Sequence, residues 1–96
     1  MIKIKVYTIL TIKKILGKRE FEVSLPEGST VKDLLSWMIK QWGESLASHL
    51  FQPGTYQPLP YIRFMVNGRL IEFLNGLETI LKDGDEFLIL PVVAGG

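Results

Sequence analysis

One amphipathic segment constrains the fold of this 96-residue chain more than any other feature. Between residues 31 and 42, apolar side chains recur at the spacing of one helix face, at Val31, Leu34, Leu35, Met38, Ile39 and Trp42. Thr30 and Asp33 form the pattern of a capping box at its start, and Gly43 is suited to end it. Because a single helix cannot bury such a stripe alone, the segment must pack against strands elsewhere in the chain.

Two strands are predicted before this helix. Residues 2–10 begin with alternating isoleucine or valine and lysine, which is the period of a half-buried strand. Residues 20–25 show the same alternation, with glutamate and serine on the solvent side. We expect the two strands to form a hairpin around a solvated basic loop that contains Lys13, Lys14, Lys18 and Arg19.

Further strands are predicted after the helix. Residues 44–51 suggest a short helical turn, and the proline-rich residues 52–60 an irregular loop. Residues 61–66 and 69–73 are expected to form strands joined by a tight Asn-Gly turn.

The last predicted strand is the apolar run from Phe87 to Leu90, which follows a tight Asp-Gly-Asp turn. An uninterrupted apolar run suits a central strand that is covered on both faces. Pro91 lacks a backbone donor, so we expect it to end this strand and to release residues 92–96 from the sheet.

The order strand, strand, helix, strand, short strand, strand predicts an α+β fold with a mixed sheet packed on one main helix. With the first and last strands parallel at its centre, this is the β-grasp, or ubiquitin-like, topology. The length is that of one domain, so residues 1–96 are expected to form a single domain with a flexible C-terminal tail at 92–96.

Composition excludes several classes of function. The formal net charge of +1 offers no long-range attraction to nucleic acid. The chain has no cysteine, which removes disulfides, thiolate metal sites and cysteine nucleophiles. It shows no signal peptide and no apolar run long enough for a membrane helix. We therefore expect a soluble cytoplasmic protein without nucleic-acid or membrane partners.

Internal catalytic groups are scarce as well. His49, the single histidine, has no carboxylate at helical spacing to orient it, and a structural or surface role is expected. The acidic turn Asp83, Asp85 and Glu86 has too few further oxygen ligands for calcium, so turn chemistry explains it better. No phosphate-binding G-x-x-x-x-G-K-[ST] loop is present. No metal ion or cofactor is expected to be bound by this chain itself.

The C-terminal pair Gly95-Gly96 remains after these exclusions. A terminal carboxylate has an intrinsic pKa of about 3.5 and is therefore an anion at neutral pH, able to attack the α-phosphate of ATP. Glycine lacks Cβ bulk, so such a tail could enter a narrow site in a partner. From the residues alone, a reactive tail and an inert frayed terminus remain equally open interpretations.

The ending from Asp83 to Gly96 resembles the close of molybdopterin-synthase small subunits, with a D-G-D-E turn, an apolar strand, a proline and a V-A-G-G tail. The similarity extends to Val66-Asn67-Gly68, to residues 25–35 and to the opening strand. The related thiamine sulfur carrier and ubiquitin-like modifiers share the final glycines. The chain departs from the family at Leu90-Pro91-Val92, where Phe-Pro-Pro is common, and at Lys13-Lys14, where an Arg-Glu pair is frequent.

The resemblance implies that an E1-like enzyme, which itself holds ATP and Mg²⁺, adenylates the carboxylate of Gly96. A sulfur donor protein then makes a thiocarboxylate, which donates its sulfur in molybdopterin or tungstopterin synthesis once a large synthase subunit takes in the tail. The chain is not expected to be catalytic alone. The alternatives are a modifier conjugated to lysines through Gly96 and a sulfur carrier for thiamine or another metabolite.

The same resemblance implies the candidate site residues. Gly96, with Gly95, presents the reacting carboxylate, and the partner-binding residues are Tyr7, Leu90, Pro91, Val92, Val93 and Ala94. Tyr7 and Leu90 are expected to form an apolar docking patch. Either residue could instead contribute only to sheet packing.

Overall fold

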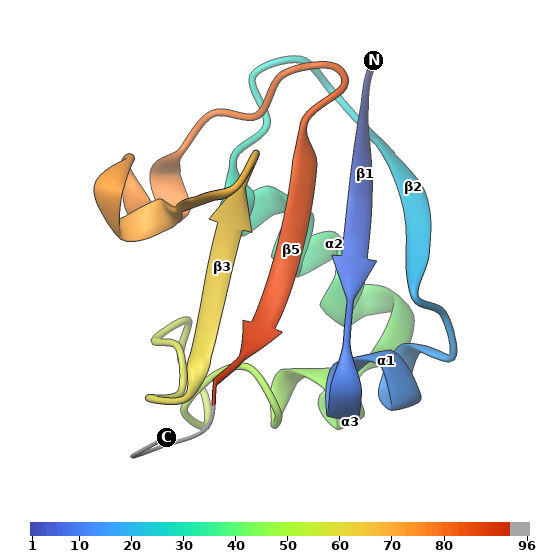
Figure 1. The fold of residues 1–96 in the computed structure, drawn as a ribbon, viewed down its shortest axis with the longest axis vertical. Helices are drawn as coiled ribbons and strands as arrows, with labels where there is room; N and C mark the ends of the chain where they lie inside the picture. Colours follow the sequence, from blue (N-terminus) through green and yellow to red (C-terminus); the bar gives the residue numbers. More distant parts are fainter. Residues whose placement is uncertain (93–96) are drawn as a thin grey trace.

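A five-stranded mixed sheet in the order β2-β1-β5-β3-β4 forms the frame of the molecule (Figure 1). The structure is a computed structural model and describes residues 1–92. The strands are β1 (Ile2–Thr8), β2 (Glu20–Leu25), β3 (Ile62–Val66), β4 (Arg69–Leu70) and β5 (Glu86–Pro91). β1 runs parallel to β5, and the other neighbouring strands are antiparallel. The predicted β-grasp topology, with first and last strands parallel at its centre, is confirmed.

The main helix α2 (Val31–Trp42) lies across one face of this sheet (Figure 1). Its predicted capping box is present: the Asp33 N–H donates to Thr30 Oγ1 (3.2 Å), and the Thr30 N–H donates to Asp33 Oδ2 (2.9 Å). At the other end, Gly43 has φ 68°, a conformation in which glycine is least strained. The stripe is fully buried only in its first part, because Ile39 and Trp42 are half-buried.

The core lies between α2 and the inner face of the sheet. Phe64 of β3 and Phe87 of β5 occupy its centre, with ring centroids 5.8 Å apart in a stacked arrangement. Both rings are almost completely inaccessible to solvent, as are Ile4 and Val6 of β1. The central strands are therefore held by side-chain packing as well as by backbone hydrogen bonds.

The predicted basic hairpin loop is wrong, because residues 10–16 form the helix α1 (Leu10–Leu16). Ile12 and Leu16, four residues apart, are buried beneath it, and the N–H of Gly17 donates to the carbonyl of Lys13 (2.8 Å) to end the helix. The first strand accordingly ends at Thr8 rather than Leu10. β1 and β2 are still antiparallel neighbours, but a helix connects them.

The segment between α2 and β5 is mostly irregular, as expected for residues 52–60. The predicted helical turn appears as α3 (Glu44–Ala47). The predicted strand at 69–73 is wrong beyond Leu70, because the chain turns into a 3-10 helix (Ile71–Phe73) that buries Ile71; a second one covers Gly76–Glu78. Within residues 1–92, no helix is long and apolar enough to cross a membrane.

The prediction that the last strand is covered on both faces is also wrong. Phe87 and Ile89 of β5 point into the core and are fully buried, whereas Leu88 and Leu90 lie on the opposite face and are half-buried. One face of the sheet thus lacks a helical layer in the part of the chain that the structure describes (Figure 1). This exposed surface is called the open face below.

Candidate functional site: the open face and the end of β5

An apolar patch lies at the centre of the open face. It consists of Tyr7 from β1, Met65 from β3, and Leu88 and Leu90 from β5, and it is called the open-face patch below. Leu88 is in register with Tyr7 on one side and with Met65 on the other. Leu90 lies two residues further along the same side of β5. All four side chains are half-buried, so the patch is partly accessible to a partner.

A hollow of about 400 Å³ opens beside the patch, lined by Tyr7, Met65, Gly68, Glu86, Phe87 and Leu88. The Tyr7 hydroxyl donates a long hydrogen bond to Glu86 Oε2 (3.4 Å). Desolvation, followed by the negative charge of Glu86, raises the pKa of Tyr7 above its usual value of 10.0. The phenol is thus a neutral hydrogen-bond donor at neutral pH, and the patch combines apolar area with one polar contact point.

Sequence reasoning found two of the four patch residues. It named Tyr7 and Leu90, and the structure places both on the open face. It missed Met65, and it missed Leu88 although the period of two places Leu88 on the same face of the strand as Leu90. The assumption that both faces of β5 are covered concealed this alternation.

The end of β5 determines where the C-terminal tail begins. Pro91 is the last residue of the strand, opposite Ile62. As predicted, the strand ends at Pro91 and Val92 lies outside it, but the N–H of Val92 still donates to the carbonyl of Tyr61 (2.7 Å). The remaining predicted site residues, Val93, Ala94, Gly95 and Gly96, lie outside the described residues.

Other polar groups considered in the sequence have local roles. Nδ1 of His49 lies 2.8 Å from the carbonyl oxygen of Ser45, and the residue is exposed. The Asp83 carboxylate accepts from the N–H of Lys3 (2.8 Å), and the Asp85 carboxylate accepts from the N–H of Lys82 (2.8 Å). These acidic side chains hold turns against the sheet. Among residues 1–92, no group of three His, Asp or Glu side chains could hold a metal ion.

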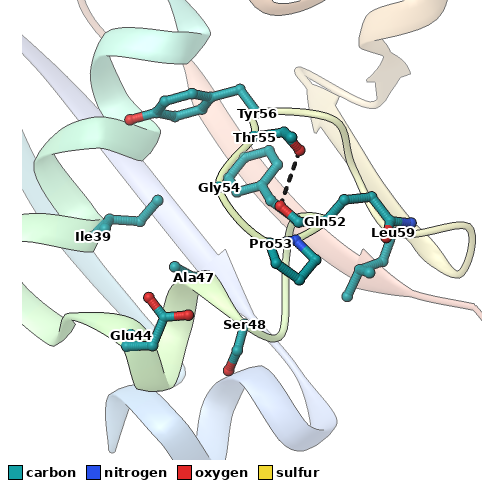
Figure 2. Close-up of a pocket in the computed structure, with 11 residues that line it drawn as sticks. Ile39, Glu44, Ala47, Ser48, Gln52, Pro53, Gly54, Thr55, Tyr56 and Leu59 are labelled. Carbon is teal, nitrogen blue, oxygen red and sulfur yellow. Dashed lines mark hydrogen bonds between the residues drawn. The ribbon is translucent and has the colours of Figure 1, made fainter.

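A separate cavity of about 300 Å³ lies between α2, α3 and the loop that follows (Figure 2). Its lining consists of Ile39, Glu44, Ala47, Ser48, Phe51, Gln52, Pro53, Gly54, Thr55, Tyr56 and Leu59. In Figure 2 the hydroxyl of Thr55 donates to the carbonyl of Gln52 (2.9 Å), which is a hydrogen bond within the loop. Glu44 is the single carboxylate in this lining, so the cavity contains no acid–base pair of carboxylates.

The fold defines a ubiquitin-like protein of the β-grasp class. Residues 10–96 match the ThiS family, and the chain belongs to that family. A small archaeal modifier protein 3 from Haloferax volcanii is 30% identical over 86 residues, covering 90% of each chain. A protein of Archaeoglobus fulgidus described as a candidate sulfur carrier is 39% identical over 70 residues, covering 73% of this chain and 77% of the relative.

Solved structures agree with this assignment. The small archaeal modifier protein 1 of Methanosarcina acetivorans has a TM-score of 0.84 at 33% identity, covering 100% of this chain and 98% of its own. A candidate molybdopterin converting factor subunit 1 of Pyrococcus furiosus has a TM-score of 0.77 at 30% identity, covering 97% and 100%. A chain of the BexX/CysO complex of Amycolatopsis orientalis has a TM-score of 0.75 at 29% identity, covering 97% and 99%.

Proposed function

We propose that this protein carries sulfur on the carboxylate of Gly96. The observation that carries the proposal is the match to the ThiS family, which extends through the terminal Gly95-Gly96. A carboxylate oxygen attacks the α-phosphorus of ATP held with Mg²⁺ by an E1-like partner, and pyrophosphate leaves. Sulfur at the oxidation level of sulfide, supplied by a sulfur donor protein, then attacks the acyl carbon, the bond to AMP breaks and AMP leaves, which gives a thiocarboxylate. The carrier supplies the acyl group, and the partner supplies the catalytic groups.

The hydrogen bond from Val92 to Tyr61 limits how far the partner's nucleotide can lie from the sheet. Four residues follow Val92, and a fully extended chain of four residues spans at most about 14 Å. The nucleotide must therefore come close to the end of β5, where α1 and α3 also lie (Figure 1). Such a short tether requires that the body of the carrier also contacts the partner.

The open-face patch is the proposed contact surface. Its centre, Leu88, is flanked by Tyr7 and Met65 and lies on the strand that leads into the tail. Aromatic and methionine side chains are enriched in the cores of protein interfaces. A partner seated on this patch would hold β5 and direct Pro91 and Val92, with the tail, toward its own active site.

Leu88→Asp is expected to weaken binding to the adenylating partner by about 10- to 100-fold, because it places a charge at the centre of an apolar interface. Phe73→Asp is the matched control, since Phe73 is 74% exposed but lies in a 3-10 helix away from the patch. The dissociation constants of both variants can be measured by calorimetric titration. Equal effects of the two substitutions would exclude the patch as the docking surface.

Intact-mass spectrometry tests the central chemical step. After coexpression with a cognate E1-like enzyme and its sulfur donor, the chain is expected to gain the mass difference between one sulfur and one oxygen. Fragmentation should locate the change at Gly96. Absence of the change with several cognate partners would refute the proposal.

The proposed acceptor is a cyclic pterin phosphate, which would receive sulfur for molybdopterin or tungstopterin when a large synthase subunit takes in the tail. Support comes from the 30% identity to the Pyrococcus furiosus protein described as a candidate molybdopterin converting factor subunit. In a reconstituted reaction, the loaded carrier should lose its sulfur only when both the large subunit and the pterin are present. Transfer to a thiamine precursor instead would assign the carrier to that pathway.

Conjugation to proteins is the second candidate function. It is favoured by the similarity to two small archaeal modifier proteins, at 30% and 33% identity. The same adenylate would then be attacked by a lysine amine to form an isopeptide bond, with release of AMP. After tryptic digestion, modified lysines of cell proteins would carry residues 83–96, because Lys82 is the last tryptic site of the chain, and these remnants would disappear when the gene is deleted.

A further inference from the structure

The outer edge of β2 offers a row of unpaired backbone groups. β2 is the last strand on its side of the sheet, and within residues 1–92 no further strand pairs with it. The N–H of Thr8 donates to the carbonyl of Arg19 (2.9 Å), which sets the phase of the antiparallel β1–β2 ladder. Residues 21, 23 and 25 bond to β1 in this phase, so Glu20, Glu22 and Ser24 direct their N–H and C=O groups outward.

Three aromatic side chains of β2 and α2 lie next to one another beside this edge. The ring centroid of Phe21 in β2 lies 5.4 Å from that of Trp42, and Trp37 lies 6.4 Å from Trp42. All three are half-buried, so their outer surfaces remain accessible. A hollow of about 490 Å³ lies beside Trp37, bounded by Leu25, Pro26 and Lys40 among others, and this hollow with the three aromatic side chains is called the edge groove below. Tryptophan is enriched among the residues that dominate binding energy at interfaces.

Negative charge on the open-face side of this edge restricts which segments can bind. Glu20 and Glu22 are exposed on the open face, next to the position that an additional strand would occupy. Lys5 lies opposite Glu22 in the ladder, yet the one ion pair found among residues 1–92 joins Arg63 and Glu72 (3.9 Å). Side chains of an added strand on this face would therefore be stabilised if they were basic.

We infer that this edge groove binds an extended segment of a partner protein as a sixth strand of the sheet. Side chains of the segment alternate: apolar ones pack against Phe21 and Trp37, and basic ones approach Glu20 and Glu22. Backbone hydrogen bonds to the edge provide affinity, and the alternation provides specificity. A second copy of the chain is a poorer occupant, because its own Glu20 and Glu22 would face those of the first. The inference is independent of the chemistry at Gly96.

A synthetic peptide of alternating lysine and valine, blocked at both ends, tests the inference with the full chain. In ¹⁵N NMR titration, amide shifts are expected at Glu20, Glu22, Ser24 and the Trp37 indole. Two versions of the peptide, each N-methylated on one alternate set of amides, should differ by about tenfold or more in affinity, because only one set faces β2. Equal binding of the two versions, or shifts confined to other elements, would overturn the inference.

Variants of the protein give a second readout. Glu22→Pro removes the outward N–H of residue 22 and leaves the β1 ladder intact. Glu22→Val loses the same charge but keeps the N–H, and it should bind the peptide about tenfold more tightly than Glu22→Pro. Amide dispersion of the free variants shows whether each is folded. Self-association through β2, detected by sedimentation and abolished by Glu22→Pro, would identify a second copy as the occupant and overturn the inference.

Discussion

Deletion of Gly96 is expected to reduce sulfur loading of this protein by at least about a hundredfold. The shortened chain still ends in a carboxylate, that of Gly95, but this group is displaced by about 3.5 Å from the position of the original one. Displacement of a reacting atom by about 1 Å can already cost about a hundredfold in rate. Since Val92 is tied to Tyr61, the tail cannot slide outward to compensate.

The measurement is the fraction of thiocarboxylate formed over time with the cognate E1-like enzyme and sulfur donor. A variant with one alanine added after Gly96 is the matched control, because it displaces the carboxylate in the opposite direction and should be equally impaired. Thermal unfolding of both variants should match the unaltered protein, since the hydrophobic core is already formed by residues 2–89. Unchanged loading in the deletion variant would contradict the requirement for a carboxylate at the position of Gly96.

Phe87→Ala is expected to lower the free energy of unfolding by about 3–5 kcal/mol. Phe87 is completely buried in the central strand β5, and its ring stacks on that of Phe64, so truncation would leave a cavity between sheet and helix. A domain of this size has a total stability of about 5–15 kcal/mol, so the loss is a large fraction of it. Urea unfolding followed by the fluorescence of Trp37 and Trp42 measures the change.

Leu88→Ala is the control for this prediction. Leu88 is the next residue of β5, but its side chain is half-buried on the open face, and a loss of only about 1 kcal/mol is expected. Similar losses for Phe87→Ala and Leu88→Ala would contradict the assignment of the two faces. The pair also separates stability from binding, because of these two substitutions only the one on the open face should weaken binding to the proposed adenylating partner.

Local patterns were sufficient to predict most elements. The apolar spacing from Val31 to Trp42 predicted α2, and the alternation in residues 2–8 and 20–25 predicted β1 and β2. The prediction of a solvated basic loop at Lys13 and Lys14 was wrong, because the apolar spacing of this segment is helical. Ile12 and Leu16, which are buried, are spaced by four residues as on a helix, and Gly17 at the end is a typical stop.

The sequence by itself determined most of the secondary structure, the β-grasp class and the resemblance to sulfur carriers, because these depend on side-chain periodicity, turn residues and the terminal glycines. Only the tertiary structure decided which face of β5 is open and which residues share it. The run Phe87–Leu90 is apolar throughout, so its pattern does not distinguish a covered face from an exposed one. Packing of α2 on one side of the sheet makes that distinction, and strand pairing brings Tyr7, Met65 and Leu88 from three strands into one patch.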